Sequence, residues 1–338
     1  MTRPTLRRLS ELLPGALAAA TVGLASAFLA QHYGGPLMLY ALLFGMAFHF
    51  LSQEGRAVAG VQFTATHVLR FGVMLLGARI TFADVQTLGL GPVLLVVAGV
   101  VLTILFGVFF ARALGLTPRL GVLTGGSVAI CGASAAMALT SVLPHKDGAE
   151  RDTLVTVIGV TTLSTLAMIT YPLIAAALGL DTRETGVFLG GTIHDVAQVV
   201  GAGYSVSEPT GDLATVMKLL RVAAMVPAVA VISMACPLRA YADPAEAAAS
   251  RRRLPRLPWF LVGFALLAAA NSAGWIPAAA SSALGDASRY ALVAAIAALG
   301  MKTSLQKMVE VGWRPAALIV AETLFIAGLV LGALALMR

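Results

Sequence analysis

The chain consists almost entirely of apolar runs that are each long enough to cross a membrane as a helix. In helical form, about 20 apolar residues span the hydrocarbon core of a bilayer. Only 12% of the residues are charged, against roughly 25% in a soluble domain, which excludes a water-soluble fold. We expect an all-α membrane protein with about 11 transmembrane helices, near residues 13–31, 36–52, 59–78, 91–114, 119–143, 153–179, 185–204, 212–235, 257–274, 288–303 and 313–337.

Lysines and arginines set the expected orientation, because in membrane proteins they collect in cytoplasmic connections. The run from Leu13 to Ala30 follows three arginines, as in a signal peptide, but it is long and no clear cleavage site follows, so we interpret it as a retained span. We expect a multi-pass protein of an inner or plasma membrane with a cytoplasmic amino terminus. The connections then expected inside carry Arg56, Arg112 with Arg119, Arg183, the 239–256 segment, and Lys307 with Arg314.

The segment 239–256 is the one long polar connection, and it holds Arg251, Arg252, Arg253 and Arg256. Such a cluster can bind lipid head groups or nucleic acid, but a basic cytoplasmic loop is also what orientation alone requires. We therefore interpret it as a linker and expect no nucleic acid partner. The expected division is 1–238 with spans one to eight and the site, 239–256 as the basic cytoplasmic loop, and 257–338 with spans nine to eleven.

Two pairs of segments within the chain resemble each other. Residues 121–128 are similar to 186–193, and residues 76–81 are similar to 299–304. In the expected topology the second pair lies in oppositely oriented helices, as an inverted repeat requires. The first pair lies in helices of the same orientation, so one duplication does not explain both pairs.

The stretch 125–134 places glycines, hydroxyls and a thiol at the expected middle of the membrane. Glycine costs roughly 1 kcal/mol in a helix interior, and non-helical backbone survives at that depth only inside protein or beside a wet cavity. We interpret the stretch as a broken helix whose free amides face an anion; close packing of small residues is the alternative. The candidate substrate-binding residues here are Gly126, Ser127, Cys131, Gly132 and Ser134.

A second polar stretch, 190–201, places His194 and Asp195 inside an apolar run. Ionisable residues within a span are costly and mark solute paths or proton relays, and histidine titrates near neutral pH. We interpret the two as proton-coupling residues, with an interhelical hydrogen bond as the structural alternative. Gly191, Thr192 and Gln198 are further candidate substrate-binding residues.

Three cations complete the candidate site. Lys218 and Arg221 lie three residues apart, on one face of an expected helix, and Arg70 is an isolated cation in another span. Two cations this close repel each other unless an anion lies beside them. The alternative is that Lys218 and Arg221 extend their heads to the membrane surface.

Other classes of site lack sequence support. The chain has no nucleophile elbow, phosphate-binding loop or zinc motif. Its cysteines, Cys131 and Cys236, fall in different runs and outside any Cys/His cluster. We expect neither a metal nor a cofactor, and no enzymatic activity.

Four of these stretches together resemble the YeiH-type family of bacterial membrane proteins, commonly described as sulfate exporters. They are 69–77, 127–134, 193–200 and 218–222, within a resemblance that covers nearly the whole chain. The one departure is Asp195, where the family pattern leads us to expect glutamate. The resemblance implies kinship with cation/proton antiporters and anion transporters, with inverted repeats and crossing, interrupted helices.

From these patterns we expect a secondary transporter of a small anion, an oxyanion such as sulfate or a sulfonate, driven by protons or another coupling ion. The expected partners are that inorganic or organic anion, the coupling ion, the lipid bilayer and a second copy in a homo-oligomer. Cations outnumber the one carboxylate noted at the site, which favours an anion over a cation. The alternatives are a cation/proton antiporter and, from another class, an intramembrane enzyme or scaffold.

Overall fold

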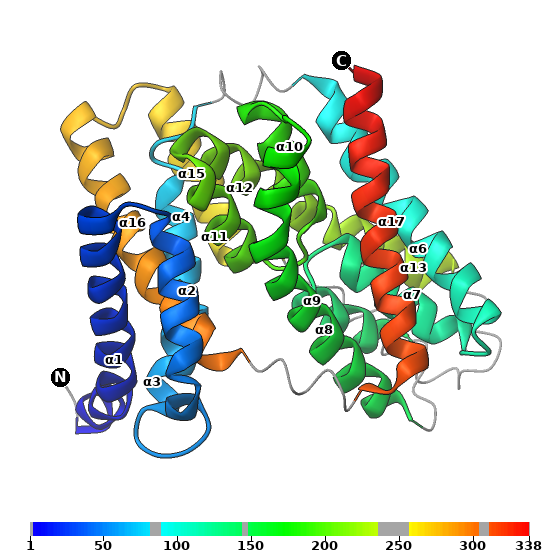
Figure 1. Ribbon diagram of the computed structural model, residues 1–338, viewed down its shortest axis with the longest axis horizontal. Helices are drawn as coiled ribbons and strands as arrows, with labels where there is room; N and C mark the ends of the chain where they lie inside the picture. The colour runs from blue at the N-terminus through cyan, green and yellow to red at the C-terminus, as the bar shows by residue number, and fades with distance from the viewer. Residues whose placement is uncertain (1–2, 82–88, 144–147, 236–256, 304–310, 338) are drawn as a thin grey trace. The chain divides into compact units, whose positions relative to one another are not determined.

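The computed structural model describes residues 3–81, 89–143, 148–235, 257–303 and 311–337. Every regular element in these ranges is helical (Figure 1). Seven helices are long and apolar enough to cross a membrane: 10–33, 58–76, 90–113, 149–177, 208–234, 278–302 and 313–337. The protein is therefore an all-α, multi-pass membrane protein, and the count of about 11 spans is not confirmed.

The described chain divides into two compact units, and each is taken by itself. Unit 1 comprises residues 1–89, 200–212 and 258–304, and unit 2 comprises 90–199, 213–257 and 305–338. The expected linker 239–256 falls outside the described residues, so the division at that loop stays a prediction. The two units interleave along the sequence, because each draws segments from both sides of that loop.

Unit 1 is built around α16 (Ala278–Lys302), against which α1, α2 and α4 pack. Glycines allow the closest approach: a Cβ atom on Gly45 would lie 2.2 Å from the carbonyl oxygen of Ala297. The other helices of this unit are α1 (Arg3–Tyr33), α2 (Leu37–Ala47), η1 (His49–Ser52), α3 (Val58–Phe63), the π-helical η2 (Thr64–Val68), α4 (Leu69–Leu76) and α15 (Trp259–Ser272).

Unit 2 contains the long helices α6 (Leu90–Ala113), α9 (Ala149–Ala177) and α17 (Trp313–Met337). Around them lie shorter helices: α7 (Pro118–Ala129), α8 (Ala133–Val142), α10 (Thr182–Thr192) and α13 (Met225–Ala235). Helices α11 (Val196–Val206) and α12 (Glu208–Ala223) each begin in one unit and end in the other. Helix α17, red in Figure 1, packs against α6, α7, α9 and α10.

The helix is interrupted at both places where glycine-rich stretches predict a break. Helix α7 ends at Ala129 and α8 begins at Ala133, with Gly132 between them at φ +62° and ψ −123°. Helix α10 ends at Thr192 and α11 begins at Val196. The conformation of Gly132 is one that a residue with a Cβ atom adopts only under strain, which explains a glycine at this break.

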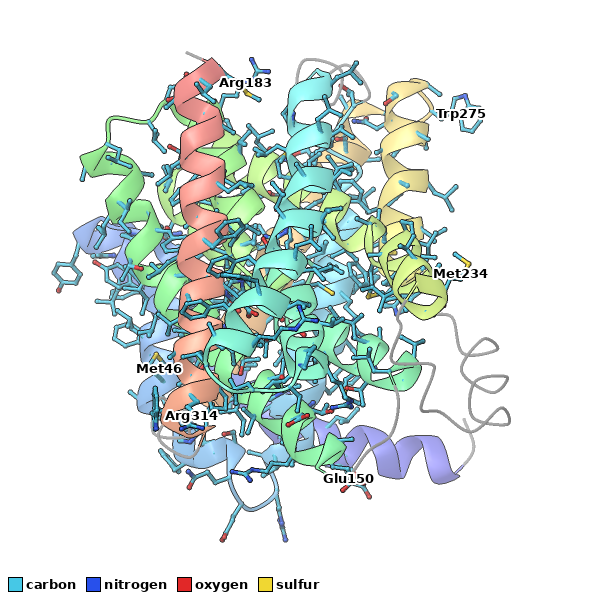
Figure 2. The ribbon with its side chains drawn as sticks, turned by 90° about the vertical axis from the view of Figure 1, so that its right-hand side faces the viewer. Met46, Glu150, Arg183, Met234, Trp275 and Arg314 are labelled. Atoms are coloured by element: carbon cyan, nitrogen blue, oxygen red, sulfur yellow. The ribbon has the colours of Figure 1, made fainter. Side chains whose placement is uncertain are left out.

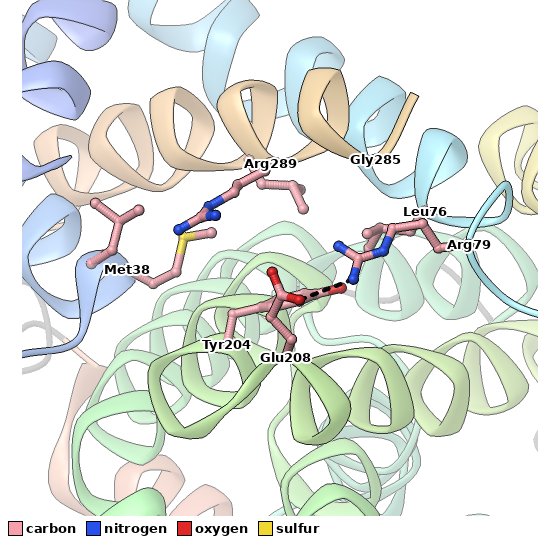
Figure 3. A pocket seen from close by; sticks show the side chains of 9 residues that line it. Met38, Leu76, Arg79, Tyr204, Glu208, Gly285 and Arg289 are labelled. Atoms are coloured by element: carbon pink, nitrogen blue, oxygen red, sulfur yellow. Dashed lines mark hydrogen bonds and ion pairs between the residues drawn. The ribbon is translucent and has the colours of Figure 1, made fainter. Parts of the chain in front are cut away.

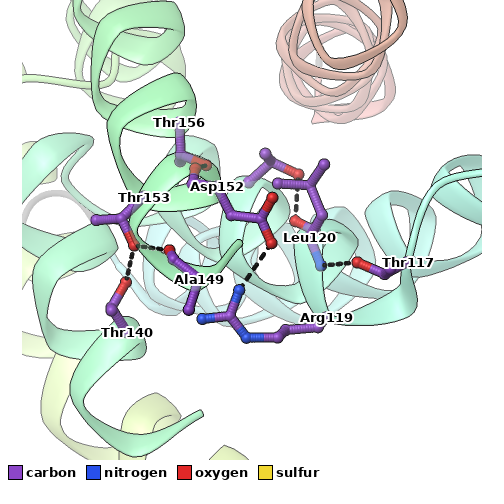
Figure 4. Close-up of polar contacts among 9 residues, drawn as sticks. Thr117, Arg119, Leu120, Thr140, Ala149, Asp152, Thr153 and Thr156 are labelled. Atoms are coloured by element: carbon purple, nitrogen blue, oxygen red, sulfur yellow. Dashed lines mark hydrogen bonds and ion pairs between the residues drawn. The ribbon is translucent and has the colours of Figure 1, made fainter. Parts of the chain in front are cut away.

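Helices α7 and α8 form a hairpin. The start of α7 and the end of α8 both lie beside the amino end of α9. Arg119, in the first turn of α7, pairs with Asp152 in the first turn of α9 at 2.8 Å. The hydroxyl oxygen of Thr140, near the end of α8, lies 2.8 Å from that of Thr153, the residue that follows Asp152 in α9 (Figure 4). Both ends of the α7–α8 segment therefore lie beside the start of α9, so the expected span 119–143 is a re-entrant hairpin.

The segment α10–α11 turns back in the same way. Gly186 of α10 adjoins Leu213, and Gly190 adjoins Ala214 and Met217, so α10 and α12 run in the same direction. Since α12 begins two residues after α11 ends, the intervening chain must return to the end at which α10 starts. The expected span 185–204 is thus a second re-entrant hairpin rather than a crossing.

The two hairpins enter from opposite ends of α9, because one ends at its first turn and the other begins after its last. This reverses the expected relation between 121–128 and 186–193, which now lie in oppositely oriented helices. It also corrects the expected orientation of Arg119 and Arg183. Arg119 lies near the start of α9 and Arg183 near its end, so at most one of the two residues is in a cytoplasmic connection.

Cysteine labelling tests the first hairpin. In a variant with Cys131 and Cys236 replaced by serine, Arg112→Cys and Glu150→Cys should react with an impermeant maleimide from the same side, because the α7–α8 segment does not cross. Arg183→Cys should react from the opposite side. Labelling of Arg112→Cys and Glu150→Cys from different sides would show that the segment spans the membrane.

Neighbouring glycines of α10 test its packing on α12. A Cβ atom on Gly190 would lie 2.3 Å from the Ala214 carbonyl oxygen, whereas on Gly191 its nearest neighbour would be Val330 at 3.4 Å. Gly190→Ala should lower stability by about 1–3 kcal/mol through overpacking. Gly191→Ala, the matched control, should be neutral or stabilising by up to ~1 kcal/mol. Thermal unfolding in detergent measures both, and equal midpoints would contradict this packing.

Candidate functional site

The tips of the two hairpins meet inside unit 2. A Cβ atom on Gly132, at the first tip, would lie 3.7 Å from both the Cβ atom and the carbonyl oxygen of His194, at the second. Four helix ends converge here: the carboxyl ends of α7 and α10 and the amino ends of α8 and α11. Helix ends carry unpaired backbone groups and partial charges, so this junction requires polar partners.

Lys218 joins the two carboxyl ends. Its Nζ atom donates hydrogen bonds to the carbonyl oxygens of Ile130, at 2.6 Å, and Ile193, at 3.0 Å. The side chain is 0% exposed. One ammonium group thus satisfies a carbonyl at the tip of each hairpin.

Arg221, one turn further along α12, does the same with four hydrogen bonds. Its Nε and Nη2 atoms donate to Ala129 and Val128 of the first hairpin, at 2.8 and 2.6 Å. Its Nη1 atom donates to Gly190 and Ile193 of the second, at 3.1 and 2.9 Å. Like Lys218 it is buried, so neither head extends to the membrane surface.

The amino ends of α8 and α11 differ in how they are capped. At α11, the Asp195 carboxylate accepts a hydrogen bond from the Ala197 amide at 2.8 Å, and the Asp195 amide donates to Ser164 Oγ at 3.0 Å. At α8 the N-cap residue is Gly132, which makes no side-chain hydrogen bond, and Ser134 in the first turn is exposed. The Cys131 sulfur, which is a weak acceptor, reaches the Ala135 amide in the first turn of α8, so this end is capped more weakly than α11.

His194 makes one hydrogen bond and Gln198 makes two, the longer of them from Nε2 to the Thr161 carbonyl oxygen at 3.5 Å, and each residue keeps one buried atom without a partner. The Nε2 atom of His194 lies 3.0 Å from Thr323 Oγ1, and Gln198 Nε2 donates to Thr165 Oγ1 at 2.8 Å. Among the described residues, His194 Nδ1 and Gln198 Oε1 have no hydrogen-bond partner. Buried polar atoms of this kind are normally satisfied, so Gln198 Oε1 is available to accept a hydrogen bond, while the His194 ring lies beside the backbone of Val128 and Thr192.

Of the remaining candidate residues, all but Arg70 lie in the two hairpins that form the junction. Ser127 and Thr192 donate their hydroxyl protons to carbonyls of their own helices, at Leu123 and Phe188. Cys131 is buried, with its sulfur 3.9 Å from that of Met225. Gly126 and Gly191 lie within α7 and α10 at the two breaks. Arg70 belongs to unit 1, where its guanidinium lies 6.0 Å from the centre of the Phe260 ring.

Sequence reasoning missed a buried carboxyl group. Glu322 of α17 is 0% exposed, and its Oε1 atom lies 2.7 Å from Thr124 Oγ1 of α7. The rule that singled out Asp195, an ionisable residue within an apolar run, applies equally to Glu322. The hydroxyl partners Ser164, Thr165 and Thr323 carry no such signal, because threonine and serine are common in membrane helices.

A second polar cluster lies in unit 1. A pocket of about 60 Å³ is lined by Arg79, Tyr204, Glu208 and Arg289, among others (Figure 3). Arg79 pairs with Glu208 at 3.1 Å, and both side chains are partly exposed. This cluster differs from the hairpin junction, whose two cations are buried, and it offers a competing place for an anion.

The six hydrogen bonds of Lys218 and Arg221 predict a structural role alongside any role in binding. Arg221→Met should cost about 3 kcal/mol or more, because buried carbonyls at both tips lose their partner. Lys218→Met should cost less, since it removes two bonds rather than four. Arg314→Met, which removes an exposed cation, is the control and should change stability by less than ~0.5 kcal/mol. Thermal unfolding in detergent measures all three, and an Arg221→Met protein as stable as the control would contradict this role.

Comparison with known proteins identifies the family. A family model described as "Conserved hypothetical protein 698" matches residues 14–319. The UPF0324 membrane protein CT0845 of Chlorobaculum tepidum is 55% identical over 326 residues, covering 96% of this chain and 90% of the relative. The UPF0324 membrane protein TauZ of Paracoccus denitrificans is 52% identical over 325 residues, covering 96% and 95%.

Among solved structures, the sodium proton antiporter MjNhaP1 of Methanocaldococcus jannaschii aligns over 96% of this chain and 99% of its own, with 12% identity and a TM-score of 0.32. A likeness at that score carries no argument about fold or function. The sequence relatives and the family model do establish family membership, since they cover nearly the whole chain. They confirm the YeiH-type resemblance, and the chain belongs to the Conserved hypothetical protein 698 family, whose relatives here are UPF0324 membrane proteins.

Proposed function

We propose that this protein is a secondary transporter of a small anion, with an oxyanion such as sulfate or a sulfonate as the substrate class and protons as the coupling ion. The observation that carries the proposal is the pair of buried cations, Lys218 and Arg221, at the meeting point of two re-entrant hairpins. Buried charges are rare inside membrane proteins and mark substrate or ion pathways.

The charge balance at the junction supports an anion. Lys218 and Arg221 contribute two positive charges, and Asp195 contributes one negative charge. The carboxyl ends of α7 and α10 offset part of the excess, while the weakly capped amino end of α8 adds to it. An anion beside α8 would meet the amides of its first turn and the exposed hydroxyl of Ser134, in the way helix amino ends bind anions elsewhere.

The hairpins supply a route for alternating access. Each enters unit 2 from a different end of α9, so a small movement of one tip would open the junction towards one side only. We propose that the similar segments 121–128 and 186–193 are an inverted repeat that makes the two routes equivalent. Residues of both tips would line the route, namely Gly126, Ser127, Cys131, Gly132, Gly191, Thr192 and Gln198, and His194 and Asp195 would exchange protons.

One observation favours the alternative of a cation/proton antiporter. Glu322 is a second buried carboxyl group in unit 2, and no ion pair reaches it within the described part of the chain. If Glu322 were ionised, the formal charges of the four residues would cancel and the preference for an anion would disappear. The transport assay must therefore follow cations as well as anions.

Flux in proteoliposomes tests the proposal. Labelled sulfate, sulfite and small organic anions should enter vesicles that contain the protein, faster with an inward proton gradient. Asp195→Asn and His194→Gln keep the shapes of the side chains but remove proton-exchanging groups, so both should transport with a flattened pH dependence. Arg289→Ala, in the unit 1 pocket, is the control and should leave flux unchanged.

Three results would contradict this function. Sodium or proton flux without any anion flux would favour the antiporter, and the absence of all flux would favour an enzyme or scaffold. Loss of anion flux in Arg289→Ala, with unchanged pH profiles in Asp195→Asn and His194→Gln, would move the anion site to the unit 1 pocket.

A further inference from the structure

Glu322 lies deep within unit 2. It is the tenth residue of the 25-residue helix α17, which places it about 13 Å along the axis from the first residue. Its side chain is 0% exposed. A carboxylate at such a depth is unstable unless a cation or several donors accompany it.

The Thr124 hydroxyl group has one proton and lies within hydrogen-bond distance of two acceptors, Glu322 Oε1 and the Leu120 carbonyl oxygen. Thr124 Oγ1 lies 2.7 Å from Glu322 Oε1 and 2.9 Å from the carbonyl oxygen of Leu120. A hydroxyl group has one proton to donate, and a carbonyl can only accept. When Thr124 donates to Leu120, the short contact with Glu322 is a hydrogen bond only if the carboxyl group donates, which requires that it carry a proton.

Within the described residues, no cationic side chain forms an ion pair with the Glu322 carboxyl group. Glu322 Oε2 has no hydrogen-bond partner among the described residues. On the other side the backbone is tightly packed, since a Cβ atom on Gly107 would lie 2.4 Å from Glu322 Oε1 and 2.6 Å from the Gly121 carbonyl oxygen. The glycines therefore make room for the carboxyl group without adding donors.

Ionisable groups on the helices that pack against Glu322 lie mainly near the helix ends. Figure 2 shows Arg183 towards one end of unit 2, and Glu150 and Arg314 towards the other. Arg119, five residues before Thr124 in α7, pairs with Asp152. The full set on α6, α7, α9, α10 and α17 is Arg112, Arg119, Glu150, Arg151, Asp152, Tyr171, Arg183, Glu184 and Arg314, with His194 following α10.

The residue next to Glu322 connects it to the hairpin junction. The Thr323 hydroxyl group contacts the His194 ring. Ile193, the residue before His194, provides a carbonyl oxygen that accepts hydrogen bonds from both Lys218 and Arg221. Glu322 itself contacts α7, the first arm of the other hairpin. Adjacent side chains of α17 therefore contact both hairpins, so a change at Glu322 is linked to both tips.

We propose that Glu322 is a proton-binding site of the transport cycle, protonated while the anion is bound. This inference rests on the proposed anion transport. With Glu322 neutral, Lys218, Arg221 and Asp195 leave one net positive charge for the anion; with Glu322 ionised, the formal charges cancel. A proton taken from water on one side forms the O–H bond of the carboxyl group, and it returns to water on the other side after the anion leaves.

Infrared spectroscopy of the detergent-solubilised protein tests the protonation without any substrate. The wild type at pH 8 should show the carbonyl band of a buried carboxylic acid, and Glu322→Gln should lack it. Glu150→Gln, which alters an exposed carboxylate, should keep the band. Thr124→Val retains the carboxyl group but removes its hydrogen-bond partner, so it should shift the band and remains informative if Glu322→Gln does not fold.

Proton movement accompanying anion flux tests the coupling. In vesicles with a trapped pH indicator, sulfate or another transported anion should carry protons with it in the wild type. Glu322→Gln should move the anion with at least a tenfold smaller proton signal per anion. An absent band in the wild type, a band unchanged in both Glu322→Gln and Thr124→Val, or equal proton-to-anion ratios would overturn the proposal while leaving anion transport standing.

Two further outcomes separate this proposal from the function on which it rests. An acid band at Glu322 in a protein that moves no anion would show that anion transport itself is wrong, and the coupling role would fall with it. Loss of the band on adding sodium chloride, but not on adding choline chloride, would show that Glu322 exchanges a proton for a metal cation, as in an antiporter.

Discussion

The six hydrogen bonds from Lys218 and Arg221 to backbone carbonyls are the interaction on which unit 2 depends. A helix that ends inside a membrane leaves carbonyl groups that lipid cannot satisfy. Two cations on a single helix face satisfy the carboxyl ends of α7 and α10 together. They thereby hold the tips of two hairpins that enter from opposite ends, and they do so with side chains that carry charge into the interior.

Glycine makes this arrangement possible at the level of packing. At Gly190 the backbone of α12 comes so close that a methyl group would overlap the Ala214 carbonyl. Gly107 and Gly121 bring α6 and α7 into backbone contact beside Glu322, and Gly132 adopts the turn between the two arms of the first hairpin. The positions of the hairpin tips and of Glu322 therefore depend on these glycines. A larger residue at any of the four positions would overlap neighbouring backbone or strain its own.

The sequence predicted the interruptions because glycine pairs and a His-Asp pair are costly inside a continuous apolar helix. It also placed Lys218 and Arg221 on one face. It did not reveal that their heads bind backbone carbonyls, because residue spacing does not specify a partner. The hairpins were missed since a re-entrant pair of short helices is as long and as apolar as one span, and only contacts such as Arg119 with Asp152 distinguish them. Glu322 was missed because a single carboxyl group hardly lowers the hydropathy of 313–337.

The location of a bound anion tests the account most directly. Selenate has the shape and charge of sulfate and a strong anomalous X-ray signal, so crystals grown with selenate would show its position without assumptions about transport. The account predicts an anomalous peak in unit 2 beside Gly132 and Ser134, at the amino end of α8. A peak between Arg79 and Arg289 in unit 1, or none at saturating selenate, would contradict it.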